Sequence, residues 1–190
     1  APIGGLIVGL LLTGLIITVF ANRKPAPVNK TFGRLQIISS AWFALTHGAN
    51  DGQKTMGIIA LILFSAGMIP ELDIPLWVIF AAAAAMGLGT FFGGYKVIKT
   101  LGVKITRLRP YQGFAAETGG GLMLAAFAIL GIPASTTHAI TGTIMGSGAA
   151  RRKRAVRWNV SRQIVFSWII TIPGAAGMGI GFTYLIHLFV

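Results

Sequence analysis

Fifteen of the sixteen Lys and Arg residues lie in three blocks that separate long apolar runs. The blocks cover residues 23–34, 96–109 and 151–162. In proteins that cross a membrane several times, such residues gather in the cytoplasmic loops. The apolar runs between the blocks reach the roughly 20 residues that a helix needs to span a bilayer. The pattern therefore predicts an all-α, polytopic protein of the cell membrane, with the three blocks on the cytoplasmic side.

Composition supports this class and bounds the alternatives. Only 11% of the residues are charged, against about 25% in soluble domains. A net charge of +12 would suggest nucleic acid in a soluble chain, but the three blocks explain it as a topology signal, so we expect membrane lipid and no nucleic acid as a partner. The absence of cysteine excludes disulfides and thiolate metal sites. The length predicts a single transmembrane domain over residues 1–190.

Residues 35–68 are too long for one straight span. As a helix they would extend for about 51 Å, whereas the hydrocarbon core of a bilayer is about 30 Å thick. The polar stretch 46–54, which contains two glycines, interrupts this apolar run. We therefore predict a discontinuous helix over 35–68 with its break at 48–53. The alternative is an ordinary loop between two helices near one membrane face.

Residues 112–149 lie between two basic blocks, so both ends belong on the same side of the membrane. The second arm of this segment is about 15 residues and reaches only about 22 Å as a helix. A re-entrant helical hairpin with its tip near residues 131–133 satisfies both constraints.

The predicted break at 48–53 would expose two helix ends. The free N–H groups at the start of the second half-helix favour an anion, and the free carbonyl groups at the end of the first suit Na⁺. We take Asn50, Gly52 and Gln53 as candidate anion ligands. Asn50, Asp51 and Ser135 are the candidate ligands for Na⁺.

A second polar group follows Pro133, at the predicted tip of the hairpin. Three hydroxyl groups in succession at a helix start would form a neutral cup for an oxyanion, and they belong to Ser135, Thr136 and Thr137. The alternative is an N-cap cluster that simply ends the hairpin. Two interrupted hydrophobic segments in one small membrane chain favour the binding site of a transporter.

Asp51 and Glu117 are the acidic residues at membrane depth, where an ionisable side chain usually has a function. We therefore assign them as candidates for carrying a coupling cation or proton. The alternative is a pair of either acid with Lys54 that only holds helices together. His47 and His138 are candidate proton carriers or metal ligands, or else they make hydrogen bonds along the helices.

An enzyme is not predicted. Ser135 and His138 lie three residues apart, but no nucleophile elbow accompanies them, so an intramembrane hydrolase is only a distant alternative. An aspartyl protease would need two membrane Asp residues, and Asp51 alone qualifies. No cofactor is expected beyond a coupling ion, H⁺ or Na⁺.

The motifs Gly48-Ala49-Asn50-Asp51-Gly52-Gln53-Lys54 and Pro133-Ala134-Ser135-Thr136-Thr137-His138 together resemble the inorganic phosphate transporter (PiT/Pho4) family. In order and spacing, residues 35–190 resemble the C-terminal half of bacterial low-affinity phosphate permeases. The resemblance implies symport of phosphate with H⁺ or Na⁺ across a bacterial inner membrane. It also implies a homodimer of chains with two inverted repeats, each with a discontinuous helix and a re-entrant hairpin.

By motif, the resemblance places six residues around the phosphate and cation sites: Asn50, Asp51, Gln53, Ser135, Thr136 and Thr137. This chain supplies only one of the two repeats, so the other half would come from a longer protein, a separate chain or a second copy. Two alternatives remain open. One is a sulfate permease, since these resemble the family, and the other is a membrane partner subunit that does not itself transport.

Overall fold

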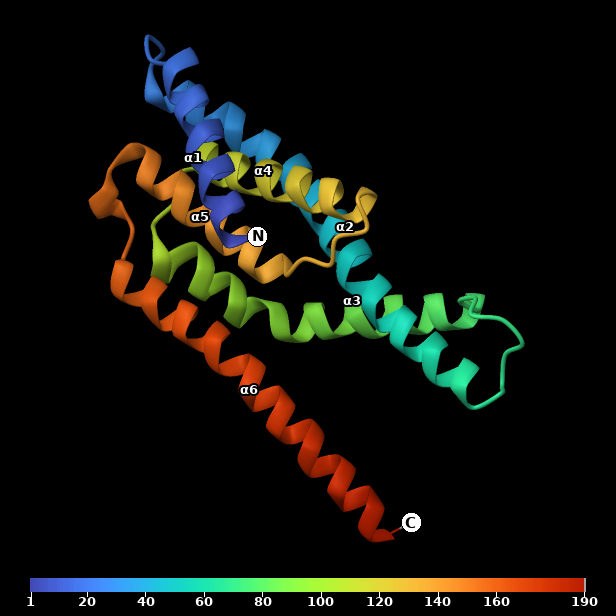
Figure 1. Ribbon diagram of the computed structural model, residues 1–190. Helices are drawn as coiled ribbons and strands as arrows, with labels where there is room; N and C mark the ends of the chain where they lie inside the picture. Colours follow the sequence, from blue (N-terminus) through green and yellow to red (C-terminus); the bar gives the residue numbers. More distant parts are fainter. Residues whose placement is uncertain (190) are drawn as a thin grey trace. The chain divides into compact units, whose positions relative to one another are not determined.

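The structure, a computed structural model, describes residues 1–189, and every regular element within them is helical. The bounds of the elements are α1 Pro2–Val19, α2 Pro25–Ser65, α3 Leu76–Lys99, the π-helix η1 Thr100–Ile105, α4 Pro110–Ile129, α5 Thr136–Arg151, the 3₁₀ helix η2 Lys153–Ala155 and α6 Trp158–Phe189 (Figure 1). The predicted all-α class is confirmed.

Three helical stretches are long and apolar enough to cross a membrane. They are Pro2–Val19, Leu76–Ile105 and Trp158–Leu188. No more than 17% of the most apolar window of any of them is buried inside the protein. Large apolar side chains left on the outside mark a surface made for another apolar medium, which for helices of this length is lipid.

Contacts divide the chain into two compact units, the first of which is Ala1–Val156. The second begins at Arg157, and its helix is α6, which contains Pro173. Both polar motifs belong to the first unit, so that unit positions the candidate site. A single domain over the whole chain stays a prediction.

The core of the first unit is a close crossing of α1 and α5. Gly5 and Gly9 on α1 face α5, and Gly142 and Gly146 on α5 face α1. A Cβ atom on Gly146 would press on the backbone of α1, at 2.8 Å from the nitrogen of Leu10. Small residues four apart let two membrane helices approach until their backbones touch. The crossing therefore fixes α5 by packing of main chain on main chain.

A helical hairpin is formed by α4 and α5, whose tip is the non-helical stretch 130–135 (Figure 1). Gly131 turns the chain there with a positive φ of 67°. At the opposite end, the Gln112 side chain donates from Nε2 to the Ser147 carbonyl at 2.8 Å and ties the two arms together. The hairpin predicted for 112–149 is therefore present, and its re-entry into the membrane stays a prediction.

The predicted break in residues 35–68 is wrong. α2 runs for 41 residues as one α-helix, straight through 48–53. Neither Gly48 nor Gly52 has a positive φ, so both glycines take ordinary helical conformation. The polar side chains in this stretch bond sideways, to the same helix and to the hairpin tip. Asp51 and Lys54 therefore find polar partners without any opening of the α2 backbone.

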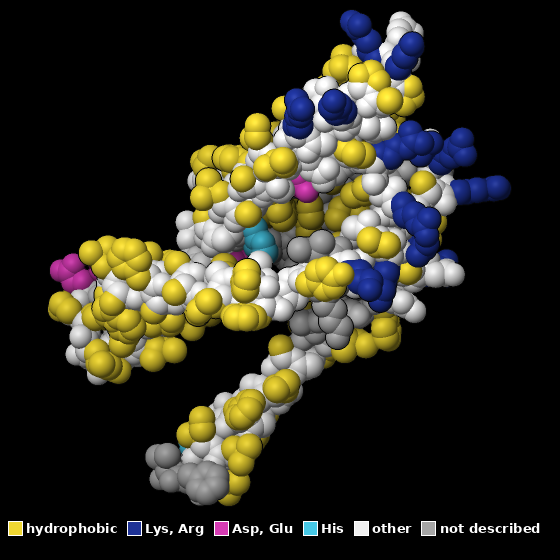
Figure 2. All heavy atoms as spheres, turned by 180° about the vertical axis from the view of Figure 1, so that it is seen from behind, with side chains coloured by type: hydrophobic (Ala, Val, Ile, Leu, Met, Phe, Trp, Pro, Cys, Tyr) yellow, Lys and Arg dark blue, Asp and Glu magenta, His cyan; other side chains and the backbone are white. Residues whose placement is uncertain are grey.

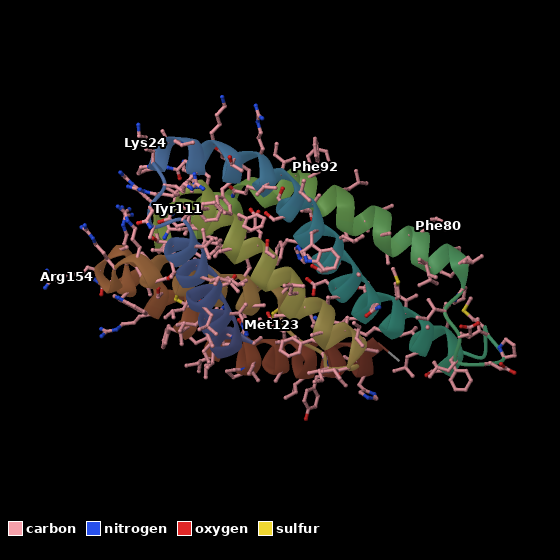
Figure 3. All side chains as sticks on the ribbon, turned by 90° about the horizontal axis from the view of Figure 1, so that it is seen from above. Lys24, Phe80, Phe92, Tyr111, Met123 and Arg154 are labelled. Atoms are coloured by element: carbon pink, nitrogen blue, oxygen red, sulfur yellow. The ribbon has the colours of Figure 1, made fainter. Side chains whose placement is uncertain are left out.

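Within the first unit, Figure 2 shows Lys and Arg side chains gathered toward one end and an acidic patch at the opposite end. The assignment of the basic blocks to cytoplasmic loops stays a prediction. Within the first unit, Lys24 and Arg154 lie at one end and Phe80 lies toward the other (Figure 3). The hairpin therefore has both of its ends at the basic side, and its tip points away from it.

Candidate functional site

Asp51 is the centre of a polar cluster where α2 passes the hairpin tip. Its Oδ2 accepts a hydrogen bond from Thr136 Oγ1 at 2.8 Å and lies 3.1 Å from His47 Nε2. Its Oδ1 lies 3.1 Å from Lys54 Nζ. His47, Asp51 and Lys54 share one face of α2, since they are four and three residues apart. These residues, with Ala134, are called the Asp51 cluster below.

Lys54 joins the two elements of the cluster. Besides its contact with Asp51, its Nζ donates to the carbonyl oxygen of Ala134 at 2.5 Å. Ala134 lies in the non-helical tip, so its carbonyl is not used in a helical ladder. The sequence motifs 48–54 and 133–138 therefore meet in space through two contacts, one from Lys54 and one from Thr136.

Asn50 lies beside Asp51 in the sequence and is nearly inaccessible, with 5% of its surface exposed. Its amide nitrogen Nδ2 is buried and has no hydrogen-bond partner among the described residues. A buried donor left unpaired costs about 1–3 kcal/mol. The site therefore contains a donor that lacks an acceptor.

α5 begins at the cluster. Ser135 is its N-cap, and Ser135 Oγ accepts from the backbone N–H of His138 at 3.3 Å. The first N–H groups of a helix carry partial positive charge, and Thr136, the first helical residue, contacts the Asp51 carboxylate. Two helix N-termini were predicted at the site. The one after Pro133 is present, and its helix begins at Thr136.

The predicted site residues differ in how far they are exposed to solvent. Asn50, Gly52 and Thr136 are buried, and Ser135 is half-buried. Gln53 and Thr137 are exposed on this chain. The binding roles assigned to them remain predictions.

Glu117 is not part of the Asp51 cluster. It lies where α4 packs on α2, with Ser39 Oγ 2.6 Å from its Oε2 and Gln36 Nε2 3.2 Å from its Oε1. Ser39 is about 18 Å along α2 from Asp51 at the rise of an α-helix. Of the two Lys54 pairs considered as alternatives, the one with Asp51 forms and Glu117 bonds elsewhere. The polar contacts of Glu117 were missed, although Gln36 and Ser39 stand three apart in an otherwise apolar run.

Among residues 1–189, no group of three or more His, Cys, Asp or Glu side chains comes together. The Asp51 carboxylate lies 3.1 Å from two nitrogen atoms, those of His47 and Lys54, and accepts a hydrogen bond from the Thr136 hydroxyl.

Helices suited to lipid, with a polar cluster between a helix and a hairpin tip, define a membrane protein of several spans. The chain belongs to the phosphate transporter family, whose family model matches residues 5–179. Members of this family are transporters, so the predictions of a transporter rather than an enzyme and of a multi-pass membrane protein are confirmed.

The chain is 51% identical over 173 residues to a probable low-affinity inorganic phosphate transporter of Rhizobium meliloti (strain 1021), covering 90% of this chain and 52% of that protein. A protein of Bacillus subtilis (strain 168) with the same description is 41% identical over 180 residues, covering 94% and 54%. The chain spans about half the length of these relatives.

A solved structure also matches, that of a sodium-dependent phosphate transporter. The TM-score is 0.69 at 27% identity, covering 90% of this chain and 52% of the other. The predicted resemblance to half of a phosphate permease is confirmed by these comparisons.

Proposed function

We propose that this chain forms about half of a transporter that moves inorganic phosphate across the cell membrane together with H⁺ or Na⁺. The descriptions of its relatives support phosphate as the substrate. The other half of the site comes from further residues of a longer protein, from a separate chain or from a second copy. Assembly as a homodimer belongs to the same proposal.

The observation that carries the proposal is the buried Asn50 amide, which is next in the chain to Asp51, the residue that contacts the start of α5. Its Nδ2 has no acceptor among the described residues, and an anion at this place would supply one. The hydroxyl group of Ser135 and the first N–H groups of α5, that of Thr136 among them, provide further donors. In this proposal Gly52 lets the anion approach the α2 backbone closely, because it has no side chain.

Gln53 and Thr137 complete the proposed phosphate site from the exposed side. Both are exposed on this half, where the second half of the transporter would cover them. They would donate to phosphate oxygens that Asn50 does not reach.

Asp51 gives a reason for phosphate over sulfate. Hydrogen phosphate carries a hydroxyl hydrogen that a carboxylate oxygen accepts, whereas sulfate at neutral pH has none and would be repelled. Each carboxylate oxygen has two lone pairs, so Asp51 can make this bond and keep its contacts with Lys54 and Thr136.

The coupling proton is assigned to Asp51 or Glu117, with His47 and His138 as further carriers. Ser39 makes the assignment to Glu117 concrete. Its Oγ lies 2.6 Å from Glu117 Oε2 and 3.1 Å from the carbonyl oxygen of Gln36. An ionised Glu117 accepts a hydrogen bond from the Ser39 hydroxyl. A protonated Glu117 donates a hydrogen bond to Ser39 Oγ, and the Ser39 hydroxyl then donates to the Gln36 carbonyl. The contact thus accommodates both states by a turn of one hydroxyl group.

The test is uptake of ³²P-phosphate into proteoliposomes, with Na⁺ and pH gradients imposed separately. It is run on this chain alone and on the full-length transporter that contains it. We expect uptake by the full-length protein, driven by one of the gradients and at least about tenfold lower for Asp51→Asn, the size of a typical coupling effect.

Asp73→Asn is the matched control, because Asp73 lies in the exposed loop after α2 and its carboxylate accepts a hydrogen bond from the N–H of the adjacent Ile74. Full coupled uptake by Asp51→Asn would exclude its role. Uptake of ³⁵S-sulfate but not phosphate would favour a sulfate permease. Phosphate uptake by neither preparation, with the chain bound in a larger complex, would favour the partner subunit.

A further inference from the structure

Lys54 stands apart from every other basic residue of the chain. The remaining fifteen Lys and Arg residues lie in the three basic blocks, whereas Lys54 lies in the middle of α2, in the Asp51 cluster. A positive side chain at membrane depth is costly unless it is paired. The topology signal that explains the other basic residues therefore does not explain Lys54.

The oxygen atoms around the Lys54 ammonium are those that hold an alkali ion in membrane proteins. They are the carboxylate Oδ1 of Asp51 at 3.1 Å and the carbonyl oxygen of Ala134 at 2.5 Å. Carbonyl groups released from helical bonding, together with carboxylates, coordinate Na⁺ in transporters with interrupted helices. Here the carbonyl of the non-helical tip and the carboxylate of α2 both point at one ammonium nitrogen instead.

Charge leads to the same conclusion. Asp51 brings one negative charge and Lys54 one positive charge, so the pair is neutral and a second cation gains little by entering. Without the ammonium, the same oxygen atoms would present a net negative charge at membrane depth, with the Thr136 hydroxyl 2.8 Å from the other carboxylate oxygen. Such a group of oxygen atoms would attract a small hard cation.

We propose that the Lys54 ammonium is a tethered cation that takes the place of Na⁺ between Asp51 and Ala134, so that this half of the transporter works without sodium at that position. The inference rests on the proposed phosphate transport and specifies the ion dependence of the same site.

A different role for Lys54 makes a different prediction. If its ammonium bound phosphate directly, removal would weaken phosphate binding in any salt, as loss of a charged hydrogen bond does. If it replaces Na⁺, removal creates a need for sodium that the unmodified protein does not have.

The experiment uses the full-length transporter that contains this half, purified and reconstituted. Lys54→Gln and Lys54→Met remove the charge while keeping much of the side-chain length, and Lys54→Arg keeps the charge. Lys30→Gln is the control for loss of one basic residue, because Lys30 is exposed in the first basic block. Two quantities are measured at fixed pH: phosphate uptake in Na⁺ against choline, and equilibrium binding of ²²Na⁺.

We expect the unmodified protein, Lys54→Arg and Lys30→Gln to bind the same amount of Na⁺. Lys54→Gln and Lys54→Met are expected to bind one more Na⁺ per chain, and their uptake to be about tenfold faster in Na⁺ than in choline, a ratio within the usual range of coupling between sites. The extra Na⁺ is also expected to raise the melting temperature of these two variants in detergent, since a ligand that binds only the folded state stabilises it.

Equal Na⁺ binding by all the variants overturns the proposal, and so does a loss of phosphate affinity in Lys54→Gln that is the same in both salts. The ²²Na⁺ and melting measurements need no transport, so they decide the question even for a variant that is inactive. A lack of phosphate uptake by the unmodified protein in every gradient would instead count against the proposed function itself.

Discussion

α2 and the hairpin tip meet at the Asp51 cluster with their backbones in opposite states. α2 remains helical through residues 48–53, and its two glycines there have no positive φ. The tip leaves the helix for residues 130–135, with Gly131 at a φ of 67°. The tip contains Pro133, whereas residues 48–53 of α2 contain no proline. Proline disfavours helical conformation in the residue before it, whereas glycine only permits a break. In this comparison, two glycines alone leave the helix closed, and the chain leaves the helix where glycine and proline stand together.

The two backbones therefore bring different chemistry to the cluster. α2 brings side chains on a continuous scaffold, namely His47, Asp51 and Lys54. The tip brings main-chain groups, the carbonyl of Ala134 and the start of α5. The charged side chains of the cluster are thus carried by the continuous helix α2, and the main-chain carbonyl and N–H groups come from the hairpin tip.

The largest effect is expected from a substitution that interrupts the α2 helix at residue 48, as the chain is interrupted at the hairpin tip. Gly48→Pro would remove a helical N–H and push the ring against the carbonyl four residues earlier, at a cost of about 3 kcal/mol or more. We expect a clear fall in the melting temperature in detergent and a loss of helical signal in far-ultraviolet circular dichroism. A variant as stable and as helical as the unmodified protein would mean that α2 is open at this point.

A smaller effect tests how α2 holds the other arm of the hairpin. Ser39→Ala removes the hydroxyl group 2.6 Å from Glu117 Oε2, and a hydrogen bond to a charged group contributes about 1.5–3 kcal/mol. Ser40→Ala is the matched control on the next residue, because Ser40 is exposed and bonds only within its own helix, to Ile37. We expect Ser39→Ala to lower thermal stability and Ser40→Ala to change it by less than about 0.5 kcal/mol. Equal changes in stability for the two variants would show that the Ser39–Glu117 contact does not stabilise the packing of α2 on α4.

Much of the frame could be predicted because it rests on strong local signals. Basic blocks on both sides of residues 112–149 required an even number of crossings, and Gly131 with Pro133 marked the tip. The meeting of motifs 48–54 and 133–138 was expected from their shared chemistry, and Thr136 and Lys54 make the contacts.

The state of α2 could not be predicted from the same signals. A polar, glycine-containing stretch at membrane depth needs partners, but the sequence does not say whether backbone or side chains find them. The contact of Lys54 with the Ala134 carbonyl and those of Glu117 with Gln36 and Ser39 join residues about 80 positions apart. No local pattern encodes such pairs, and the Lys54 contact is one that satisfies a polar side chain of this stretch without opening α2.

The smallest expected effects come from the same substitution, glycine to alanine, in both regions. The test is whether each variant is more or less stable than the unmodified protein. Gly48→Ala places a Cβ atom in open space on a regular helix, so we expect a gain of about 0.4–1 kcal/mol from a less flexible unfolded chain. Gly131→Ala also meets no neighbour, but its positive φ is unfavourable for alanine, at a cost of roughly 1–2 kcal/mol. Melting temperatures in detergent should therefore rise for the first variant and fall for the second. Since neither Cβ atom touches anything, packing cannot account for a difference, and only backbone conformation remains. A fall for both would mean that Gly48, like Gly131, needs a conformation that alanine resists, and that α2 opens at the Asp51 cluster after all.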